Sequence, residues 1–191
     1  MTFLQQHKPQ QAWIFENRAL LPMRQQSLWQ IEAGIVRAIT WLEDGTIIVL
    51  GLWGPGERLG KPIAQVDPYQ IECMSEVKAI AVPLANPQQI TDMLTRHLKQ
   101  MQDLTIIRSY SRVETMMLKL LAWLARQFGQ ETQTGQLINL RLTHQDIADL
   151  LGTTRVTITR ALNQLEQQGM IERLPLHRLV LKECDTWHYE I

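Results

Sequence analysis

Residues 142–165 read LTHQDIADLLGTTRVTITRALNQL, and this stretch decides the fold of the carboxy-terminal part of the chain. Thr143 and Asp146 stand three residues apart at the start of a periodic apolar segment, a spacing that predicts a capped helix start. Gly152 supplies the turn conformation that a residue with a β-carbon resists. A second periodic segment follows at once, and two helices joined by so tight a turn predict a helix-turn-helix.

The second helix of this pair is expected to have one face in the core. Thr153 or Thr154 caps its start, because a threonine hydroxyl can accept from the first free backbone N–H groups. A core-facing stripe then runs from Val156 or Ile158 through Leu162 to Leu165 at helical spacing. The sequence leaves both of these choices open.

The opposite face of the second helix carries arginine, valine and threonine. A guanidinium bonds guanine bidentately, and valine or threonine methyl groups meet the thymine methyl group, so this arc suits the major groove of DNA. The arc consists of Arg155, Val156, Thr159 and Arg160. Groups near the two helix starts suit backbone phosphates, and they belong to Thr143, His144, Thr154 and Thr157. The alternative is an ordinary solvated helix face with scattered arginines.

The segment after the second helix, residues 169–183 (GMIERLPLHRLVLKE), has alternating apolar runs on both sides of Leu-Pro-Leu-His. This pattern predicts a β-hairpin, which forms a wing beside the helix-turn-helix. Arg173, His177 and Arg178 either touch the DNA backbone or belong to a wing that only covers the helices. The sequence does not choose between these two interpretations.

Short apolar runs separated by turn signals fill residues 14–82 and predict a meander of β-strands. The tripeptide EDG at 43–45 is a hairpin signal that pairs a strand at 35–42 with one at 46–53. Tryptophans recurring at intervals of one strand plus its turn are expected to fill the interior of a small β-roll, and an aromatic ligand cage is the alternative. They are Trp29, Trp41 and Trp53.

A long helix is predicted from residue 88 to about 110, with Pro87 in its first turn and Asn86 as its cap. Apolar residues advance along it by three or four positions, the near-heptad spacing of a seam that pairs with a second copy of the chain. The seam consists of Leu94, Leu98, Met101, Leu104 and Ile107. The alternative is a helix that packs only on its own β-domain.

A second helix is predicted at 113–129, capped by Ser111 and ended by Gly129, and it is expected in the core of the carboxy-terminal domain. A polar loop at 130–136 and a short strand-like run at 137–142 follow it. The sequence thus predicts an α+β fold. Its parts are a sensor-like β-roll (1–85), a dimerisation helix (86–112) and a winged helix-turn-helix domain (113–191).

Composition and motifs exclude several other classes of protein. The 191 residues include 19 Lys and Arg against 19 Asp and Glu, so a local basic face must hold any anionic partner. Cys73 and Cys184 match no metal-binding spacing, and neither do the five histidines. No glycine-rich phosphate loop, HExxH or GxSxG indicates an enzyme. Without a signal peptide or a membrane-length apolar stretch, a cytoplasmic protein with no membrane partner is expected.

A β-meander, a long helix and a winged helix-turn-helix in this order resemble the CRP/FNR family of bacterial transcription regulators, whose sensor domain has a cyclic-nucleotide-binding fold. The run GTTRVTITRALNQLEQQGMI at 152–171 is similar to the family's recognition helix. LWQIEAGIVR at 28–37 and LWGPGERLG at 52–60 are similar to its sensor-domain motifs. Within the family, TRVTITR at 154–160 is similar to the cyanobacterial global nitrogen regulator.

This resemblance implies a homodimer that reads a palindrome on double-stranded DNA, with RNA polymerase as a further partner. By position, Arg155 and Arg160 match the family's base-contacting arginines. Val156 stands where the cAMP receptor protein carries a base-reading Glu. Because valine cannot accept from cytosine N4 as a carboxylate does, the resemblance implies a GTA-type half-site rather than TGTGA.

The chain departs from the family pattern where a cyclic nucleotide would bind. Gly60 is followed by Lys61 instead of the ribose-binding Glu, and Tyr69 and Gln70 stand in place of the phosphate-binding arginine. Binding of cAMP or cGMP is therefore not expected, because the phosphate lacks its bidentate partner. Neither haem nor an iron–sulfur cluster is expected, and Cys73 is expected to be a small buried apolar side chain.

Arg37, Arg58 and Lys61 are the nearest cationic candidates for an anionic effector such as 2-oxoglutarate. Solvated surface charges are the alternative, and a regulator without any effector is a third possibility. The sequence therefore predicts a sequence-specific, DNA-binding transcription regulator. The alternative function is a ligand-sensing or protein-interaction module that does not read DNA and tolerates loss of Arg155 and Arg160.

Overall fold

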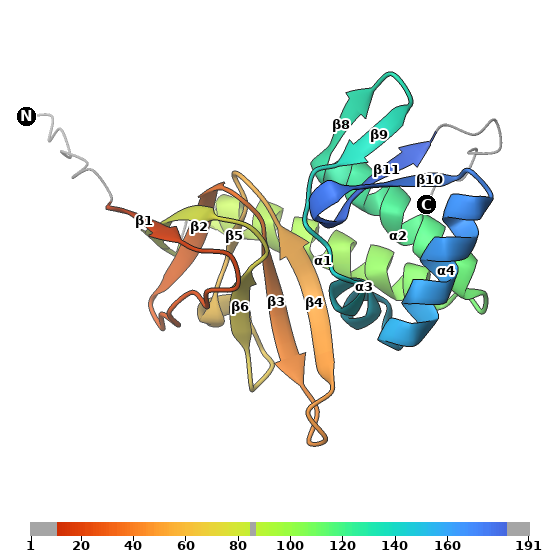
Figure 1. Cartoon of the computed structure of the whole chain (residues 1–191). Helices are drawn as coiled ribbons and strands as arrows, with labels where there is room; N and C mark the ends of the chain where they lie inside the picture. Colours follow the sequence, from red (N-terminus) through yellow and green to blue (C-terminus); the bar gives the residue numbers. More distant parts are fainter. Residues whose placement is uncertain (1–10, 85–86, 183–191) are drawn as a thin grey trace, which may run out of the picture. The chain divides into compact units, whose positions relative to one another are not determined.

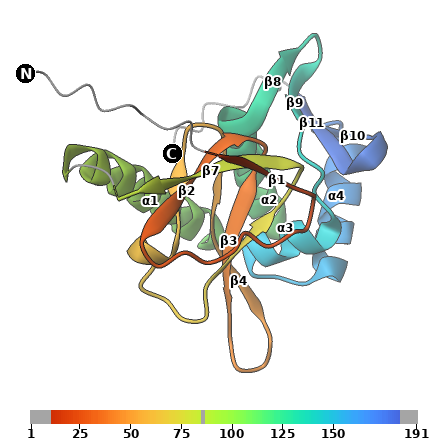
Figure 2. The same ribbon diagram turned by 90° about the vertical axis from the view of Figure 1, so that its left-hand side faces the viewer.

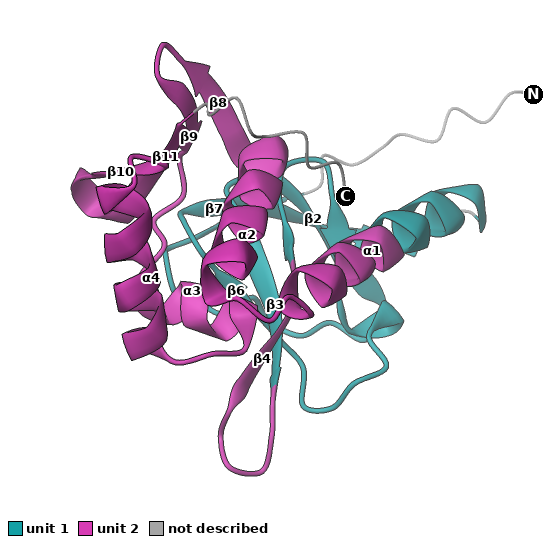
Figure 3. Ribbon diagram, turned by 90° about the vertical axis from the view of Figure 1, so that its right-hand side faces the viewer, with its two compact units in different colours: residues 1–40, 52–96 teal, residues 41–51, 97–191 magenta. Residues whose placement is uncertain are grey.

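The structure is a computed structural model that describes residues 11–84 and 87–182 (Figure 1). The chain forms two compact units (Figure 3). Unit 1 consists of residues 1–40 and 52–96, and unit 2 of residues 41–51 and 97–191. The predicted α+β class is confirmed, because strands are the main regular elements of unit 1 and helices are those of unit 2.

Short antiparallel strands build the amino-terminal part of the chain, as the turn-separated apolar runs predict (Figure 2). They are β1 (Ala12–Phe15), β2 (Ser27–Ala33), β3 (Val36–Trp41), β4 (Ile47–Trp53), β5 (Arg58–Leu59), β6 (Gln70–Cys73) and β7 (Val77–Pro83). One sheet has the order β1-β7-β2-β5 and another the order β4-β3-β6. A short 3-10 turn, Lys61–Ile63, follows β5.

Two of the three predicted core tryptophans are buried. Trp29 is 1% exposed and donates its indole N–H to the Pro22 carbonyl at 2.9 Å, and Trp53 is 4% exposed. Trp41 is 36% exposed, so its predicted place in the interior is wrong. It is the last residue of β3, directly before the hairpin turn, and the buried positions of that strand end at Ile39.

The long helix, α1 (Pro87–Arg108), has two apolar stripes instead of the single predicted seam. Leu94, Leu98 and Met101 are 44%, 56% and 51% exposed. Leu104 and Ile107 are 1% and 0% exposed, so their predicted role in a seam between two chains is wrong. At about 100° per residue, these two side chains point roughly 80–140° away from the exposed stripe, toward their own chain. The predicted cap Asn86 lies outside the described residues.

Unit 2 combines helices with a small sheet, in the order α2 (Val113–Phe128), β8 (Gly129–Thr132), β9 (Gly135–Ile138), α3 (His144–Leu151), α4 (Arg155–Gln167), β10 (Ile171–Leu174) and β11 (Arg178–Lys182). α2 lies in the core as predicted, and it contacts α3, α4 and strands of the sheet. The N-cap residue of α2 is Arg112, whose side chain makes no capping hydrogen bond, so the prediction that Ser111 caps this helix is wrong.

The polar segment after α2 is a hairpin, and the predicted loop at 130–136 is therefore wrong. β8 pairs with β9, and β9 pairs with β11 of the wing, in the sheet order β10-β11-β9-β8. β8 forms its ladder with the adjacent β9, and the polar side chains of this hairpin give no apolar periodicity from which to predict a strand. No helix in the described part of the chain is long and apolar enough to span a membrane.

The two units differ from the domain boundaries expected from the sequence. The boundary crosses α1 after Arg96, and the β3–β4 hairpin residues 41–51 belong to the same unit as the helix-turn-helix. The buried residues Leu104 and Ile107 lie in the part of α1 that belongs to unit 2.

Candidate DNA interface

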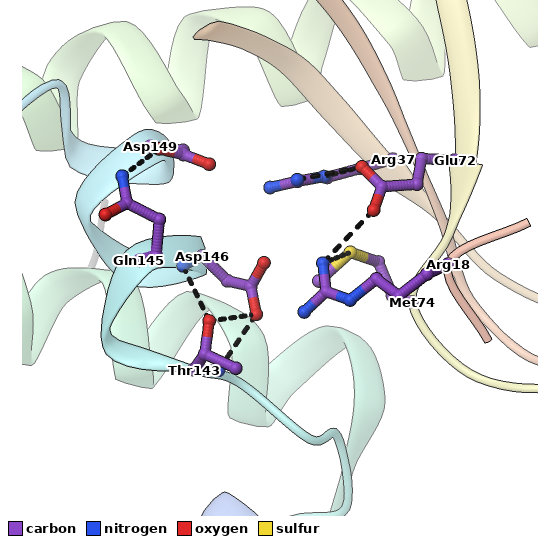
Figure 4. Close-up of polar contacts among 8 residues, drawn as sticks. All are labelled: Arg18, Arg37, Glu72, Met74, Thr143, Gln145, Asp146 and Asp149. Atoms are coloured by element: carbon purple, nitrogen blue, oxygen red, sulfur yellow. Dashed lines mark hydrogen bonds and ion pairs between the residues drawn. The ribbon is translucent and has the colours of Figure 1, made fainter. Parts of the chain in front are cut away.

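The first helix of the helix-turn-helix, α3, begins with a complete capping box (Figure 4). The Thr143 hydroxyl accepts from the Asp146 N–H at 3.1 Å, and the Asp146 carboxylate accepts from the Thr143 N–H at 2.9 Å. Two backbone donors at the helix start are thereby satisfied. Gly152 ends the helix in the left-handed conformation, with φ 66° and ψ 39°. The predicted capped start and glycine turn are both confirmed.

The start of the second helix, α4, resolves the two choices that the sequence leaves open. Thr154 is the N-cap, and its side chain accepts from the Thr157 N–H at 3.2 Å. Ile158 is 0% exposed and belongs to the core, whereas Val156 is 59% exposed. The cap therefore directs Val156 outward at the first turn of the helix.

The outer face of α4 carries the residues predicted to meet base edges, and we refer to Arg155, Val156, Thr159 and Arg160 as the recognition arc. Thr159 is half-buried and the other three side chains are exposed. The first turn of α4 contains no acidic residue. The inner face is buried and consists of Ile158, Ala161, Leu162 and Leu165. The fold thus presents two guanidinium groups and small methyl-bearing side chains on one exposed surface.

His144, the first residue of α3, is bonded to the recognition arc. Its Nδ1 lies 2.8 Å from Thr159 Oγ1. The Thr159 hydroxyl donates its one hydrogen to the Arg155 carbonyl at 2.9 Å, so it accepts from the Nδ1–H of the ring. Burial lowers the pKa of His144, and the positive charges of Arg173, His177 and Arg155 lower it further. The ring is therefore neutral at pH 7, with Nε2 as its unprotonated atom.

The wing of strands β10 and β11 is present as predicted, with antiparallel pairing from Ile171↔Leu181 to Leu174↔Arg178. The turn between the strands contains Leu176 at φ 64° and His177 at φ 57°, a left-handed conformation that costs energy for residues other than glycine. The Leu142 N–H donates to the His177 carbonyl at 3.3 Å and ties this turn to the segment before α3.

A surface pocket of about 330 Å³ is lined by His144, by basic side chains of the wing and by apolar side chains. Arg173, His177 and Arg178 line it. Arg173 is bound to Glu166, with Nε donating to Oε2 at 2.8 Å, and this ion pair holds the pKa of Glu166 below its usual range. Arg178 Nε donates to the Pro175 carbonyl at 3.3 Å. Three cationic or titratable groups of the wing therefore lie close to the start of α3.

The three predicted effector-binding cations each have their own partner in unit 1. Arg37 is 5% exposed and forms a 2.8 Å ion pair with Glu72, so it is not a solvated surface charge (Figure 4). Arg58 Nε donates to the Gln30 amide oxygen at 2.8 Å. Lys61 forms a 3.1 Å ion pair with Asp67.

Sequence reasoning missed Glu72, which is the centre of the cluster at Arg37. Its second oxygen pairs with Arg18 at 3.2 Å (Figure 4). Glu72 lies directly opposite Arg37 in the β3–β6 register. Opposite charges at facing positions of neighbouring strands are the signal for this pair, and reading it requires the strand pairing.

Tyr69 and Cys73 are buried, at 8% and 0% exposed. Burial raises the pKa of both side chains, that of the Cys73 thiol to about 12. The phenol and the thiol are therefore neutral at pH 7, and Cys73 is the small buried apolar side chain that the sequence predicts.

Comparison with known proteins agrees with this architecture. Residues 117–185 match the Crp-like helix-turn-helix domain. The regulatory protein CysR of Synechococcus elongatus is 42% identical over 164 residues, which cover 84% of this chain and 79% of that protein. The chain belongs to the CRP/FNR family. This family member is accordingly a DNA-binding transcription regulator, and its relatives are regulators rather than enzymes.

Further members of the family are similar to part or most of this regulator. The global nitrogen regulator of the same species is 46% identical over 48 residues, which cover 25% of this chain and 22% of that protein. The fold of this CRP/FNR regulator is similar to that of TTHB099, a CRP-family transcriptional regulator from Thermus thermophilus, with a TM-score of 0.77 and 20% identity. That match covers 90% of this chain and 92% of the other.

Proposed function

We propose that this CRP/FNR regulator acts as a homodimer that reads a palindromic operator. The exposed stripe on α1, formed by Leu94, Leu98 and Met101, carries the proposal. These side chains recur at i, i+4 and i+7, the spacing with which two helices interlock. Large apolar side chains on one face of a charged helix favour burial against a second copy of the same helix.

The recognition arc would then enter the major groove once in each half-site. Arg155 and Arg160 supply bidentate donors for guanine, and the exposed Val156 supplies methyl groups for thymine. Thr143, His144, Thr154 and Thr157 lie at the two helix starts, where backbone N–H groups and hydroxyls suit phosphates. Because Val156 offers no acceptor to cytosine, we expect a GTA-type half-site.

We further propose that cyclic nucleotides do not control this regulator. A cyclic phosphate needs a cationic fork, and the place of the family arginine holds Tyr69, a buried phenol. Lys61, in the place of the ribose-binding carboxylate, is bound to Asp67. The likeness to nitrogen regulators makes 2-oxoglutarate the anionic effector to test at Arg58 and Lys61, with transcription then altered through contact with RNA polymerase.

Selection of binding sites from random double-stranded DNA with the purified protein tests this function. We expect a palindromic motif to be enriched without any added small molecule. The double variant R155A/R160A should enrich none, while R126A, an exposed arginine of α2 outside the recognition arc, should enrich the wild-type motif. Enrichment of a single, non-repeated half-site would contradict the dimer.

Repeating the selection with cAMP and with 2-oxoglutarate tests the effector proposal. Unchanged enrichment with cAMP is expected, because the arginine fork is missing. A motif that emerges only with cAMP would overturn the proposal that cyclic nucleotides do not control this regulator.

A further inference from the structure

The last residue of α1, Arg108, makes two hydrogen bonds that join elements far apart in the sequence. Its Nε donates to the Leu150 carbonyl of α3 at 2.8 Å, and its Nη2 donates to the Val49 carbonyl of β4 at 2.7 Å. All three residues belong to unit 2, in which the β4 hairpin residues and the end of α1 are grouped with the helix-turn-helix (Figure 3). One guanidinium therefore connects three elements.

Both acceptors are carbonyls that regular secondary structure leaves available. Leu150 lies in the last turn of α3, where the final carbonyls of a helix have no partner within the helix. A cation there is also favoured by the negative end of the helix dipole. β4 is the outer strand in the order β4-β3-β6, and an outer strand has carbonyls that no neighbouring strand of its sheet uses.

The arrangement is selective for arginine. Burial lowers the pKa of the Arg108 guanidinium, which reflects the cost of removing the charge from water. Charge-assisted hydrogen bonds offset that cost, and the planar fork with several donors reaches two acceptors in different directions. A lysine ammonium on a flexible stem is a point charge and lacks this fixed fork.

The position of α3 determines where α4 points, because the two helices are joined by the tight turn at Gly152 and pack against each other. We infer that Arg108 is a positioning residue for DNA reading: its two hydrogen bonds hold α3 against strand β4 and so fix the direction of α4. This inference rests on the proposed role of the recognition arc. In this inference, Arg108 links the β3–β4 hairpin to α3 and, through α3, to α4.

Two variants and a control test the link. R108Q removes the charge and the fork, and R108K keeps the charge but removes the fork. R96Q changes an exposed arginine of the same helix. Affinity for the selected operator is measured by fluorescence anisotropy, dimerisation by sedimentation and folding by circular dichroism. Spin labels at T46C and N163C, both exposed positions of unit 2, report the distance from the β4 hairpin to α4 in a C184S background.

We expect R108Q and R108K to weaken operator binding by about tenfold or more, since two hydrogen bonds to a charged group are lost or impaired. Both should broaden the label distance distribution while the dimer and the helical content stay as in the wild type. R96Q should bind and report the same distances as the wild type. Because the distance between the spin labels is measured without DNA, it tests the positioning role of Arg108 even if the operator proposal fails.

Wild-type affinity and an unchanged distance distribution in R108Q would overturn the inference. So would wild-type behaviour of R108K, because a positive charge alone would then be sufficient. If R108Q does not fold, R108K decides the question, since it retains the charge and the aliphatic stem.

Discussion

Replacing His144 with asparagine tests whether this regulator takes up a proton when it binds DNA. In the free protein, burial together with Arg173, His177 and Arg155 lowers the pKa of His144. Its Nδ1–H is engaged by Thr159 Oγ1 at 2.8 Å, so Nε2 is the atom that titrates. In the proposed complex, a DNA phosphate beside the ring would accept from Nε2–H and screen the neighbouring cations. We therefore expect DNA binding to raise the pKa of His144.

Operator affinity is then expected to rise as the pH falls. Uptake of one proton limits the change to a factor of about ten per pH unit, or about 30-fold between about pH 7.5 and 6.0. We expect several-fold, because titration over this range is partial. The assay is fluorescence anisotropy with labelled operator at constant ionic strength, since phosphate contacts depend steeply on salt. H144N keeps an N–H donor for Thr159 but cannot titrate, so its affinity should not vary with pH.

The stability of the free protein should depend on pH in the opposite direction to its operator affinity, and should fall as the pH falls. The pKa of His144 is lower in the folded than in the unfolded chain, so the unfolded chain binds the proton more readily. This stability is therefore fully present above the unfolded pKa of about 6.5 and is lost as the pH falls from there through the lower folded pKa. H177N, which removes the neighbouring imidazole of the wing, is the control and should keep the affinity slope. A slope that persists in H144N would refute the assignment of the proton to His144.

Three further predictions concern recognition, assembly and folding. R155A should cost about 1–3 kcal/mol on the operator and relax the preference at one base pair, measured against single-base-pair operator variants; equal weakening on random DNA would indicate a phosphate contact instead. M101E should place a charge in the exposed stripe of α1 and dissociate the dimer in sedimentation, whereas Q102E, on the next position, should not; an unchanged dimer in M101E would show that the stripe is not the interface. T143A should lower the free energy of unfolding by about 0.5–2 kcal/mol in urea titrations because the capping box is lost, while T143S should restore it.

The helix-turn-helix was predictable because its signals are local. The capping box at Thr143 and Asp146 and the left-handed turn at Gly152 each involve neighbours in the sequence, and the structure has both. The same local reasoning predicts that the N-cap of α4 is either Thr153 or Thr154. The choice of Thr154 required the actual hydrogen bond to the Thr157 N–H.

Features that depend on distant residues were missed or misassigned. The polar composition of β8 predicts a loop, but β8 is a strand that pairs with β9, which in turn pairs with the distant β11. Sequence reasoning treats Arg37 as a surface cation. Its charge is instead buried because it pairs with Glu72 at the facing position of the neighbouring strand. For Arg37, the deciding residue comes from another part of the chain, and for β8 the small sheet is completed by such a segment, β11.

The sequence by itself determined the class of fold, the helix-turn-helix and the outward position of Arg155 and Arg160, because caps, turns and helical periodicity act over a few residues. Only the tertiary structure decided which apolar stripe of α1 is covered, with Leu104 and Ile107 buried and Leu98 exposed. It also decided that Arg108 reaches carbonyls of β4 and α3. Periodicity shows that a side chain is apolar or charged, but burial and hydrogen bonding are set by whatever the folded chain brings next to it.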